Sequence, residues 1–186
     1  MSLKQKVIAI DGPSASGKGT VASRVAEALG FLYLDSGALY RLTALYAQKQ
    51  NVAWTDEDAV STLAETLPAQ FEGNVVLLNG EDVSEQIRTE AIGMGASAVA
   101  QLPKVRTALL QRQRDFLTEK GLVADGRDIG SVIFPDAALK IFLTASANVR
   151  AQRRAKQLGI PCEGVAFERI LSDIEARDEA DRRRPV

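Results

Sequence analysis

The chain has 186 residues, of which 46% are hydrophobic and 25% charged, enough for one compact domain with a small insertion. Its formal net charge of −1 gives no global field that would attract nucleic acid or an anionic membrane surface. One cysteine and no histidine exclude an internal disulfide, a histidine-ligated zinc site and imidazole acid–base catalysis. The first apolar stretch is too short for a signal peptide or a membrane span, so we expect a cytoplasmic location.

The N-terminal third has the pattern of a strand, a helix and a second strand. Residues 6–11 form a short β-branched run that stops at Gly12-Pro13, as a buried strand entering a loop does. From residue 17 the apolar positions recur with a helical period, and Gly30 suits the position after the helix. Residues 31–34 then predict a second buried strand. Together these elements predict a βαβ unit.

The middle of the chain changes character. Short strands are predicted at residues 70–72, 75–78 and 81–83, and Asn79-Gly80 is typical of a hairpin turn, so we expect a small antiparallel meander. Helical patterns surround this meander, the last beginning with proline at its first position. The predicted helices cover residues 37–50, 56–67, 89–100 and 103–119.

The remaining elements complete the predicted fold class. Residues 122–124 and 139–143 are further buried strands of the same parallel sheet. Residues 148–186 form two arginine-rich helical stretches, broken at Gly159-Ile160-Pro161. We therefore expect an α/β fold: a parallel sheet flanked by helices, with a small antiparallel insert and an arginine-rich helical lid. Because residues 12–20, between the first strand and the helix, contain glycines and a lysine at the spacing of a phosphate-binding loop, we expect the sheet to be of the P-loop NTPase type.

A glycine-rich segment with a lysine follows the first predicted strand. It comprises Gly12, Pro13, Ser14, Ala15, Ser16, Gly17, Lys18, Gly19 and Thr20. Between a strand and a helix, such a segment lets backbone N–H groups converge on phosphate oxygens, while Lys18 neutralises the β- and γ-phosphates. The usual pattern has serine or threonine directly after the lysine; here Gly19 intervenes, and Thr20 is the candidate ligand for Mg²⁺. A glycine-rich turn without a ligand is the alternative, but the flanking elements favour a nucleoside triphosphate site, and the Lys-Gly-Thr ending resembles nucleoside monophosphate kinases.

Two further polar segments follow predicted strands. After the second strand, Asp35 or Ser36 could simply cap a helix, yet Arg41 lies one turn further on, where it can reach an anion near the helix N-terminus. The second segment runs from Asp125 to Asp128 and includes Arg127. A surface turn would tolerate these residues, but open α/β sheets bind ligands at this position.

The arginine-rich C-terminal region is the fourth candidate. On its final helix, Arg177, Asp181 and Arg184 share one face at i, i+4 and i+7. A solvated charged face would have the same pattern. Beside a phosphate loop, however, mobile arginines suit phosphoryl transfer, which needs cations more than covalent help from the protein. Arg150, Arg153 and Arg154 of the preceding helix are candidates for the same lid.

In order and spacing these motifs resemble the bacterial cytidylate kinases, which transfer a phosphoryl group from ATP to CMP or dCMP. The resemblance covers essentially the whole chain and includes residues 84–88 (SEQIR) and 132–137 (VIFPDA). It implies ATP as phosphoryl donor, Mg²⁺ as cofactor, and CMP or dCMP as acceptor. We expect a monomer with no nucleic-acid or membrane partner.

The resemblance also implies roles for single residues. The catalytic set would be Lys18, Arg127, Arg154, Arg177 and Arg184. Ser36, Arg106 and Asp128 would recognise cytosine, and Ser97 would also contact the base. Arg41, Arg127 and Arg177 would hold the CMP phosphate, Asp181 would contact the sugar hydroxyls, and Tyr40 belongs to the same substrate motif.

The family pattern implies one domain in three regions. These are a core at about 1–35 and 101–147, a monophosphate-binding insert at about 36–100, and a lid at about 148–186; we expect the family's final strand and helix to be absent. Another kinase of this fold, for uridylate or shikimate, would have different residues after the second strand. A nucleotide-binding regulator such as a switch GTPase would need a guanine-reading Asn-Lys-x-Asp segment, which the sequence lacks.

Overall fold

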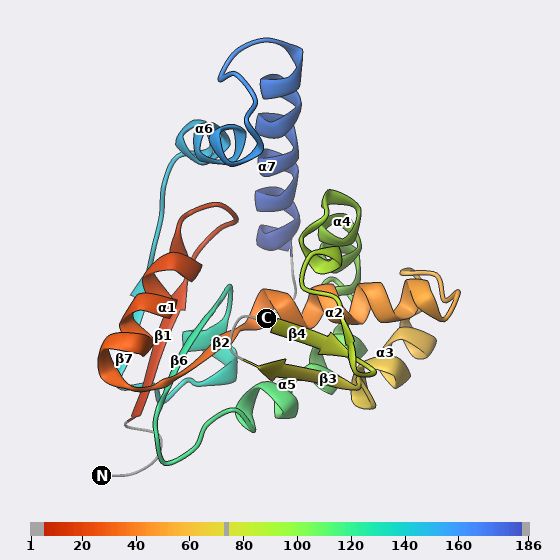
Figure 1. The fold of residues 1–186 in the computed structure, drawn as a ribbon, viewed down its shortest axis with the longest axis vertical. Coiled ribbons are helices and arrows are strands. Elements are labelled where there is room, and N and C mark those ends of the chain that lie inside the picture. The colour runs from red at the N-terminus through yellow and green to blue at the C-terminus, as the bar shows by residue number, and fades with distance from the viewer. Residues whose placement is uncertain (1–5, 73–74, 184–186) are drawn as a thin grey trace. The chain divides into compact units, whose positions relative to one another are not determined.

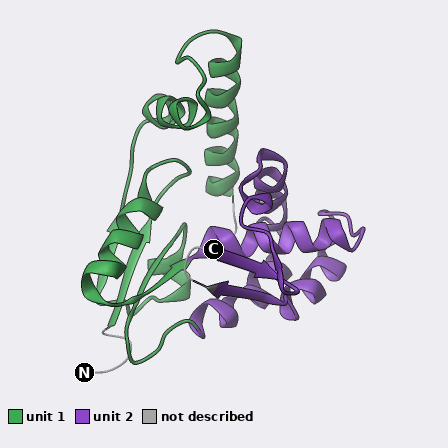
Figure 2. Ribbon diagram, viewed as in Figure 1, with its two compact units in different colours: residues 1–34, 116–186 green, residues 35–115 purple. Residues whose placement is uncertain are grey.

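The computed structural model describes residues 6–72 and 75–183. The chain forms two compact units (Figure 2). The first comprises Met1–Leu34 and Phe116–Val186, and the second comprises Asp35–Asp115. Each unit is described by itself.

A four-stranded parallel sheet organises the first unit (Figure 1). Its strands lie in the order β2 (Leu32–Asp35), β6 (Leu122–Gly126), β1 (Val7–Asp11) and β7 (Leu139–Phe142). The central strand β1 pairs in parallel with β6 and with β7, so that Ala9 lies opposite both Ala124 and Lys140. Strand β6 is buried along its whole length. The predicted α/β class with a parallel sheet is confirmed.

Helix α1 (Lys18–Leu29) packs on this sheet. Ala22 and Ala26 of the helix form a core cluster with Ile10 of β1 and Val123 of β6. Gly30 ends the helix in the left-handed conformation, with φ of 65°, and its N–H donates to carbonyls of the last turn. A glycine adopts this conformation without the steric cost of a Cβ, so the predicted helix end is confirmed.

Strand β7 differs from its prediction in burial. An apolar run was expected to be a buried strand, but Leu139, Ile141 and Phe142 are all exposed, Phe142 by 69%. Among the described residues, this strand lies at the end of the sheet order and pairs with β1. Apolar composition indicates a strand, but it does not indicate whether the strand is central or at an edge.

Two helices complete the first unit (Figure 1). Helix α6 (Ala147–Leu158) ends at Gly159, which has φ of 67°, and α7 (Val165–Arg183) follows. They pack through a cluster in which Ala151 and Ala155 of α6 meet Phe167 and Ile174 of α7. The predicted helix pair with a break between its members is therefore present.

The second unit combines helices with a three-stranded antiparallel sheet. Its elements are α2 (Ser36–Lys49), α3 (Glu57–Glu65), β3 (Ala69–Glu72), β4 (Val75–Leu78), β5 (Glu81–Asp82), η2 (Gln86–Arg88), α4 (Glu90–Val99) and α5 (Pro103–Arg114). The strands lie in the order β3-β4-β5. Asn79 and Gly80 join β4 to β5 with positive φ at both positions, as a type I′ turn requires. The predicted meander is confirmed.

The predicted end of α5 is wrong. The helix was expected to reach residue 119, but it ends at Arg114, with Asp115 as its C-cap. No glycine or proline occurs between residues 115 and 120, so the sequence contains no stop signal there. The chain turns at Gly121, whose N–H donates to the Thr118 carbonyl.

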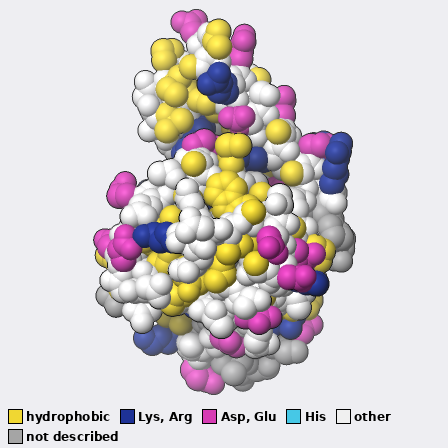
Figure 3. Space-filling model, turned by 90° about the vertical axis from the view of Figure 1, so that its right-hand side faces the viewer, with side chains coloured by type: hydrophobic (Ala, Val, Ile, Leu, Met, Phe, Trp, Pro, Cys, Tyr) yellow, Lys and Arg dark blue, Asp and Glu magenta, His cyan; other side chains and the backbone are white. Residues whose placement is uncertain are grey.

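The surface of the described residues has no strong charge bias on the face shown in Figure 3, where acidic and basic side chains lie interspersed among apolar ones. None of the helices in the described part of the chain is long and apolar enough to cross a membrane.

Candidate active site

The glycine-rich loop lies between the end of β1 and the start of α1. Helix α1 begins at Lys18 after Gly17, which has φ of 91° and provides no side-chain cap. At Gly12, a Cβ would lie 2.1 Å from the Leu143 carbonyl oxygen, so only glycine fits between the strands here. Lys18 turns back over the loop, with its Nζ 3.5 Å from the Pro13 carbonyl oxygen. The helix N-terminus and the lysine therefore both lie at the loop, as a phosphate site needs.

Two serine hydroxyls in this loop are buried without a hydrogen-bond partner among the described residues. They are the Oγ atoms of Ser14 and Ser16, and the Ser16 residue is only 4% exposed. Buried polar groups are nearly always hydrogen-bonded in native proteins, and an exception calls for an explanation. A phosphate oxygen would accept a hydrogen bond from either hydroxyl.

Three arginines donate hydrogen bonds to alternate carbonyls of the same loop. Arg127 donates to Gly12 O at 2.9 Å, Arg150 to Ser14 O at 3.2 Å, and Arg153 to Ser16 O at 2.8 Å. Arg127 follows β6, whereas the other two belong to α6. Three guanidinium groups thus surround the loop, although the chain as a whole carries a net charge of −1.

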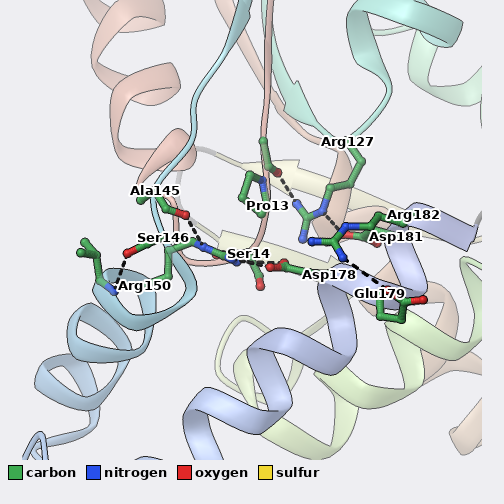
Figure 4. A network of polar contacts seen from close by, with 12 residues as sticks. Pro13, Ser14, Arg127, Ala145, Ser146, Arg150, Asp178, Glu179, Asp181 and Arg182 are labelled. Carbon is green, nitrogen blue, oxygen red and sulfur yellow. Dashed lines mark hydrogen bonds and ion pairs between the residues drawn. The ribbon is translucent and has the colours of Figure 1, made fainter.

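Two of these arginines also pair with carboxylates of α7, as Figure 4 shows. Arg127 Nε lies 2.6 Å from Asp181 Oδ2. Arg150 binds Asp178 through both terminal nitrogens, and its side chain is only 3% exposed. It also donates from Nε to the Ala145 carbonyl at 2.9 Å. The two pairs connect helix α7 to the phosphate loop.

A pocket of about 520 Å³ opens beside these pairs. Its walls come from the loop, the end of β7, and helices α6 and α7, all in the first unit. They include Gly12, Phe142, Ser146, Arg150 and Asp181. The volume is within the range of small-molecule sites, and the walls combine apolar, cationic and acidic groups.

The structure places Asp125, for which the sequence predicts no role, beside the loop. This residue is 3% exposed at the end of β6, and it accepts a hydrogen bond from Tyr33 Oη at 2.5 Å. A Cβ built on Gly19 would lie 3.6 Å from its Oδ2, so the carboxylate faces the first turn of α1. The sequence did contain a signal for this residue: an acidic side chain near the end of a predicted buried strand, where open α/β sheets bind ligands.

Asp11 fixes the backbone that follows Arg127 and Asp128. Its two carboxylate oxygens accept the N–H groups of Ile129 and Gly130, each at 2.8 Å. Burial raises the pKa of Asp11 above its ordinary value of 3.8, while these two hydrogen bonds act in the opposite direction. The two N–H groups belong to the first residues of a π-helical turn, η3 (Ile129–Ile133). The backbone that presents Asp128 is thereby held by a buried carboxylate.

The second unit contains the other predicted substrate residues. On α2, Arg41 donates from Nη1 to the Ile87 carbonyl at 2.8 Å, and Ser36 is buried at the helix start. On α4, the Ser97 hydroxyl donates to the Gly93 carbonyl at 3.2 Å. Tyr40 and Arg106, on α2 and α5, are half-buried.

The remaining predicted residues lie in the first unit. Thr20 is exposed in the first turn of α1, and Arg154 and Arg177 are half-buried on α6 and α7. Arg184 lies outside the described residues. Within this unit, the structure brings Lys18, the loop, Arg127 and Asp181 together.

A parallel sheet, a phosphate loop at a helix N-terminus and surrounding arginines define a P-loop nucleotide-binding protein of the kinase type. The sequence profile of the family described as cytidylate kinase matches residues 8–186. The chain belongs to the cytidylate kinase family.

Curated relatives agree with this assignment. The chain is 80% identical over 183 residues to a cytidylate kinase of Neisseria meningitidis serogroup C. The aligned residues make up 98% of this chain and 84% of that protein. A cytidylate kinase of Neisseria gonorrhoeae is 79% identical over the same shares of both chains. A cytidylate kinase of Chromobacterium violaceum is 59% identical over 180 residues, covering 97% of this chain and 81% of that protein.

Proposed function

We propose that this chain transfers the γ-phosphoryl group of ATP to CMP or dCMP, giving ADP and CDP or dCDP. The phosphate loop from Gly12 to Thr20, surrounded by three arginines, carries the proposal. Membership in the cytidylate kinase family supports the choice of acceptor.

The loop would hold the triphosphate of ATP. Backbone N–H groups at the start of α1 would donate to the phosphate oxygens, and Lys18 would neutralise the β- and γ-phosphates. The buried hydroxyls of Ser14 and Ser16 would each gain a phosphate oxygen as acceptor. This accounts for two polar atoms that otherwise stay unpaired among the described residues.

The residues beside the loop fit Mg²⁺. This ion keeps several waters and is usually held by one or two carboxylates together with substrate phosphates. Asp125 supplies a buried carboxylate facing the first turn of α1, and the Thr20 hydroxyl lies in that turn. When bound, Mg²⁺ would neutralise charge that develops on the phosphates.

Arginines would hold the acceptor and stabilise the transferred group. We propose that Arg41, Arg127 and Arg177 bind the CMP phosphate, and that Asp181 binds the sugar hydroxyls. Ser36, Ser97, Arg106 and Asp128 would read the cytosine base, and Tyr40 belongs to the same substrate motif as Ser36. Arg154 and Arg184 would approach the transferring phosphoryl group. Arg127 is held by Asp181 and Gly12, which would orient its guanidinium.

Direct in-line transfer suits these residues. The phosphate of CMP is a dianion near neutral pH and needs no general base, consistent with a chain that lacks histidine. Lys18 and the arginines would stabilise charge spreading over the transferred group. Closure of the arginine-rich lid, residues 148–186, would exclude water and limit ATP hydrolysis. The core, insert and lid boundaries, the monomeric state and the cytoplasmic location remain predictions from the sequence.

A coupled assay with ATP and each of CMP, dCMP, UMP, AMP and shikimate tests the acceptor. We expect the highest kcat/KM for CMP or dCMP. Fastest turnover of any other acceptor would overturn the substrate assignment.

The variant Lys18→Ala separates a kinase from a nucleotide-binding module. We expect kcat to fall roughly 100-fold or more, the scale seen when one preorganised charge-stabilising group is removed. Lys120→Ala, an exposed lysine after α5, is the matched control and should leave kcat unchanged. A change in ATP affinity alone, with kcat retained in Lys18→Ala, would contradict the catalytic role.

A further inference from the structure

A buried chain of two hydrogen bonds starts at Ser36. The Ser36 hydroxyl donates to Oε1 of Gln113 at 2.7 Å, and Nε2 of the same glutamine donates to the Leu109 carbonyl at 3.3 Å. Ser36 is 3% exposed and Gln113 is fully buried. Ser36 opens α2 and Gln113 lies in the last turn of α5, so both belong to the second unit.

The direction of these hydrogen bonds follows from chemistry. A backbone carbonyl can only accept, so the amide nitrogen of Gln113 must be the atom that faces Leu109. The amide oxygen then faces Ser36, and this oxygen also can only accept. The single hydrogen of the Ser36 hydroxyl is therefore committed to Gln113. Toward any further partner, Ser36 Oγ can act only as an acceptor.

We propose that Gln113 is a positioning residue that sets pyrimidine specificity by holding Ser36 as a hydrogen-bond acceptor. This inference rests on the proposed function, in which Ser36 contacts cytosine. Position 4 of the ring distinguishes the two pyrimidines, because cytosine has an amino group there and uracil has a carbonyl oxygen. An acceptor at Ser36 pairs with the amino group. If the same acceptor faced the carbonyl oxygen of uracil, two hydrogen-bond acceptors would face each other and no hydrogen bond would form.

The buried glutamine makes this polarity difficult to reverse. A serine hydroxyl exposed to water rotates freely and could donate to uracil as readily as it accepts from cytosine. Here rotation would break the hydrogen bond to Gln113 and leave its buried Oε1 unpaired. From the usual cost of such an unpaired group, we expect discrimination of about 10- to 100-fold from this contact.

The variant Gln113→Met tests the proposal. Methionine has a similar length but lacks the strong acceptor oxygen, so the Ser36 hydroxyl would be free to rotate and donate. We expect the ratio of kcat/KM for CMP to kcat/KM for UMP to fall about 10- to 100-fold. Both substrates are measured on one preparation, so the ratio does not depend on the fraction of folded enzyme.

The variant Gln113→Glu is the matched control. In either protonation state, glutamate presents an oxygen that can accept from Ser36, although the ionised form loses the donor to Leu109. We expect this variant to be less stable to heat while its CMP-to-UMP ratio stays near the wild-type value. A purely structural role for Gln113 predicts no such difference between the two variants.

A double-mutant comparison shows whether Gln113 acts through Ser36. Ser36→Ala should itself lower the CMP-to-UMP ratio, and adding Gln113→Met to it should have no further effect on the ratio. If Gln113→Met does not fold, Gln113→Asn, which withdraws the acceptor by one methylene, takes its place.

The outcomes separate this inference from the proposed function. A wild-type enzyme that prefers CMP, with Gln113→Met keeping the full preference, would overturn the inference alone. A wild-type enzyme that uses UMP as well as CMP would overturn the proposed function and the inference with it. A loss of preference in Gln113→Met but not in Gln113→Glu would support both.

Discussion

Replacing Asp178 by alanine would leave the guanidinium of Arg150 buried without its carboxylate partner. The Arg150 side chain is 3% exposed and that of Asp178 is 16% exposed, but both residues line the pocket beside the loop, so water in the pocket would replace part of the lost interaction. Removing one member of a buried ion pair typically costs about 3–5 kcal/mol of unfolding free energy. Arg150 would keep its hydrogen bonds to the carbonyls of Ala145 and Ser14, which favours the lower end of that range.

Thermal unfolding followed by circular dichroism measures this loss. For a chain of this length, each kcal/mol shifts Tm by roughly 2–4 °C, so about 3 kcal/mol predicts a decrease of roughly 6–12 °C. The double variant Arg150→Met with Asp178→Leu removes both charges and should recover most of the decrease, because well-packed apolar side chains can replace a buried pair. We also expect the shift to persist in high salt, since buried pairs are weakly screened.

An exposed pair on the same helix provides the control. On α7, Arg183 Nε lies 2.8 Å from Glu179 Oε1, and the two side chains are 77% and 47% exposed. Exposed pairs contribute little, so Arg183→Ala should leave Tm within about 2 °C of wild type. If Asp178→Ala shifted Tm no more than Arg183→Ala, the argument that α7 is anchored to the phosphate loop through Arg150 would fail.

Two further predictions concern packing and pH. In Gly95→Ala the new Cβ would lie 2.5 Å from the ring of Trp54, so we expect a loss of about 1–3 kcal/mol from overpacking, measured by urea unfolding with tryptophan fluorescence. Burial raises the pKa of Asp11 above 3.8, so from pH 3.8 up to the folded pKa the native state binds more protons than the unfolded state. The free energy of unfolding should therefore fall as pH rises through this window, relative to Asp11→Asn, when urea unfolding is compared across that range.

Control variants show which outcomes would contradict the predictions for Gly95 and Asp11. Met94, beside Gly95 on the same helix, is 63% exposed, and Met94→Ala should leave the urea midpoint nearly unchanged. Equal midpoints for Gly95→Ala and Met94→Ala would contradict the overpacking argument. A stability difference between wild type and Asp11→Asn that stays constant with pH would show that Asp11 titrates alike in both states.

The local features of the fold were predictable from the sequence. Gly30 and Gly159 end helices because each adopts positive φ, and Asn79-Gly80 forms the turn that its composition predicts. The phosphate loop follows from the spacing of its glycines. The end of α5 and the exposure of β7 were not predictable, because both depend on neighbours that periodicity does not reveal.

For the candidate site, too, the sequence indicated some residues, whereas their contacts became clear only in the structure. Sequence patterns identified Lys18 and Arg127 as candidates, but not the partner that each side chain would have. Asp125 belongs to a polar segment that the sequence pattern indicates, but its position beside Gly19 depends on the pairing of β1 with β6. The pairing of Ser36 with Gln113 joins residues 77 positions apart, and no local pattern indicates it.

The sequence by itself determined the strand, the glycine-rich loop and the helix that we propose bind phosphate, because backbone conformation in this segment depends on nearby residues and the spacing of its glycines indicates that conformation. Only the tertiary structure decided which arginines contact the loop carbonyls, which carboxylates hold them, and which glutamine orients Ser36. These contacts join segments distant in the chain, and each depends on how helices and strands pack. Side-chain direction and burial, which set hydrogen-bond polarity, arise only from that packing.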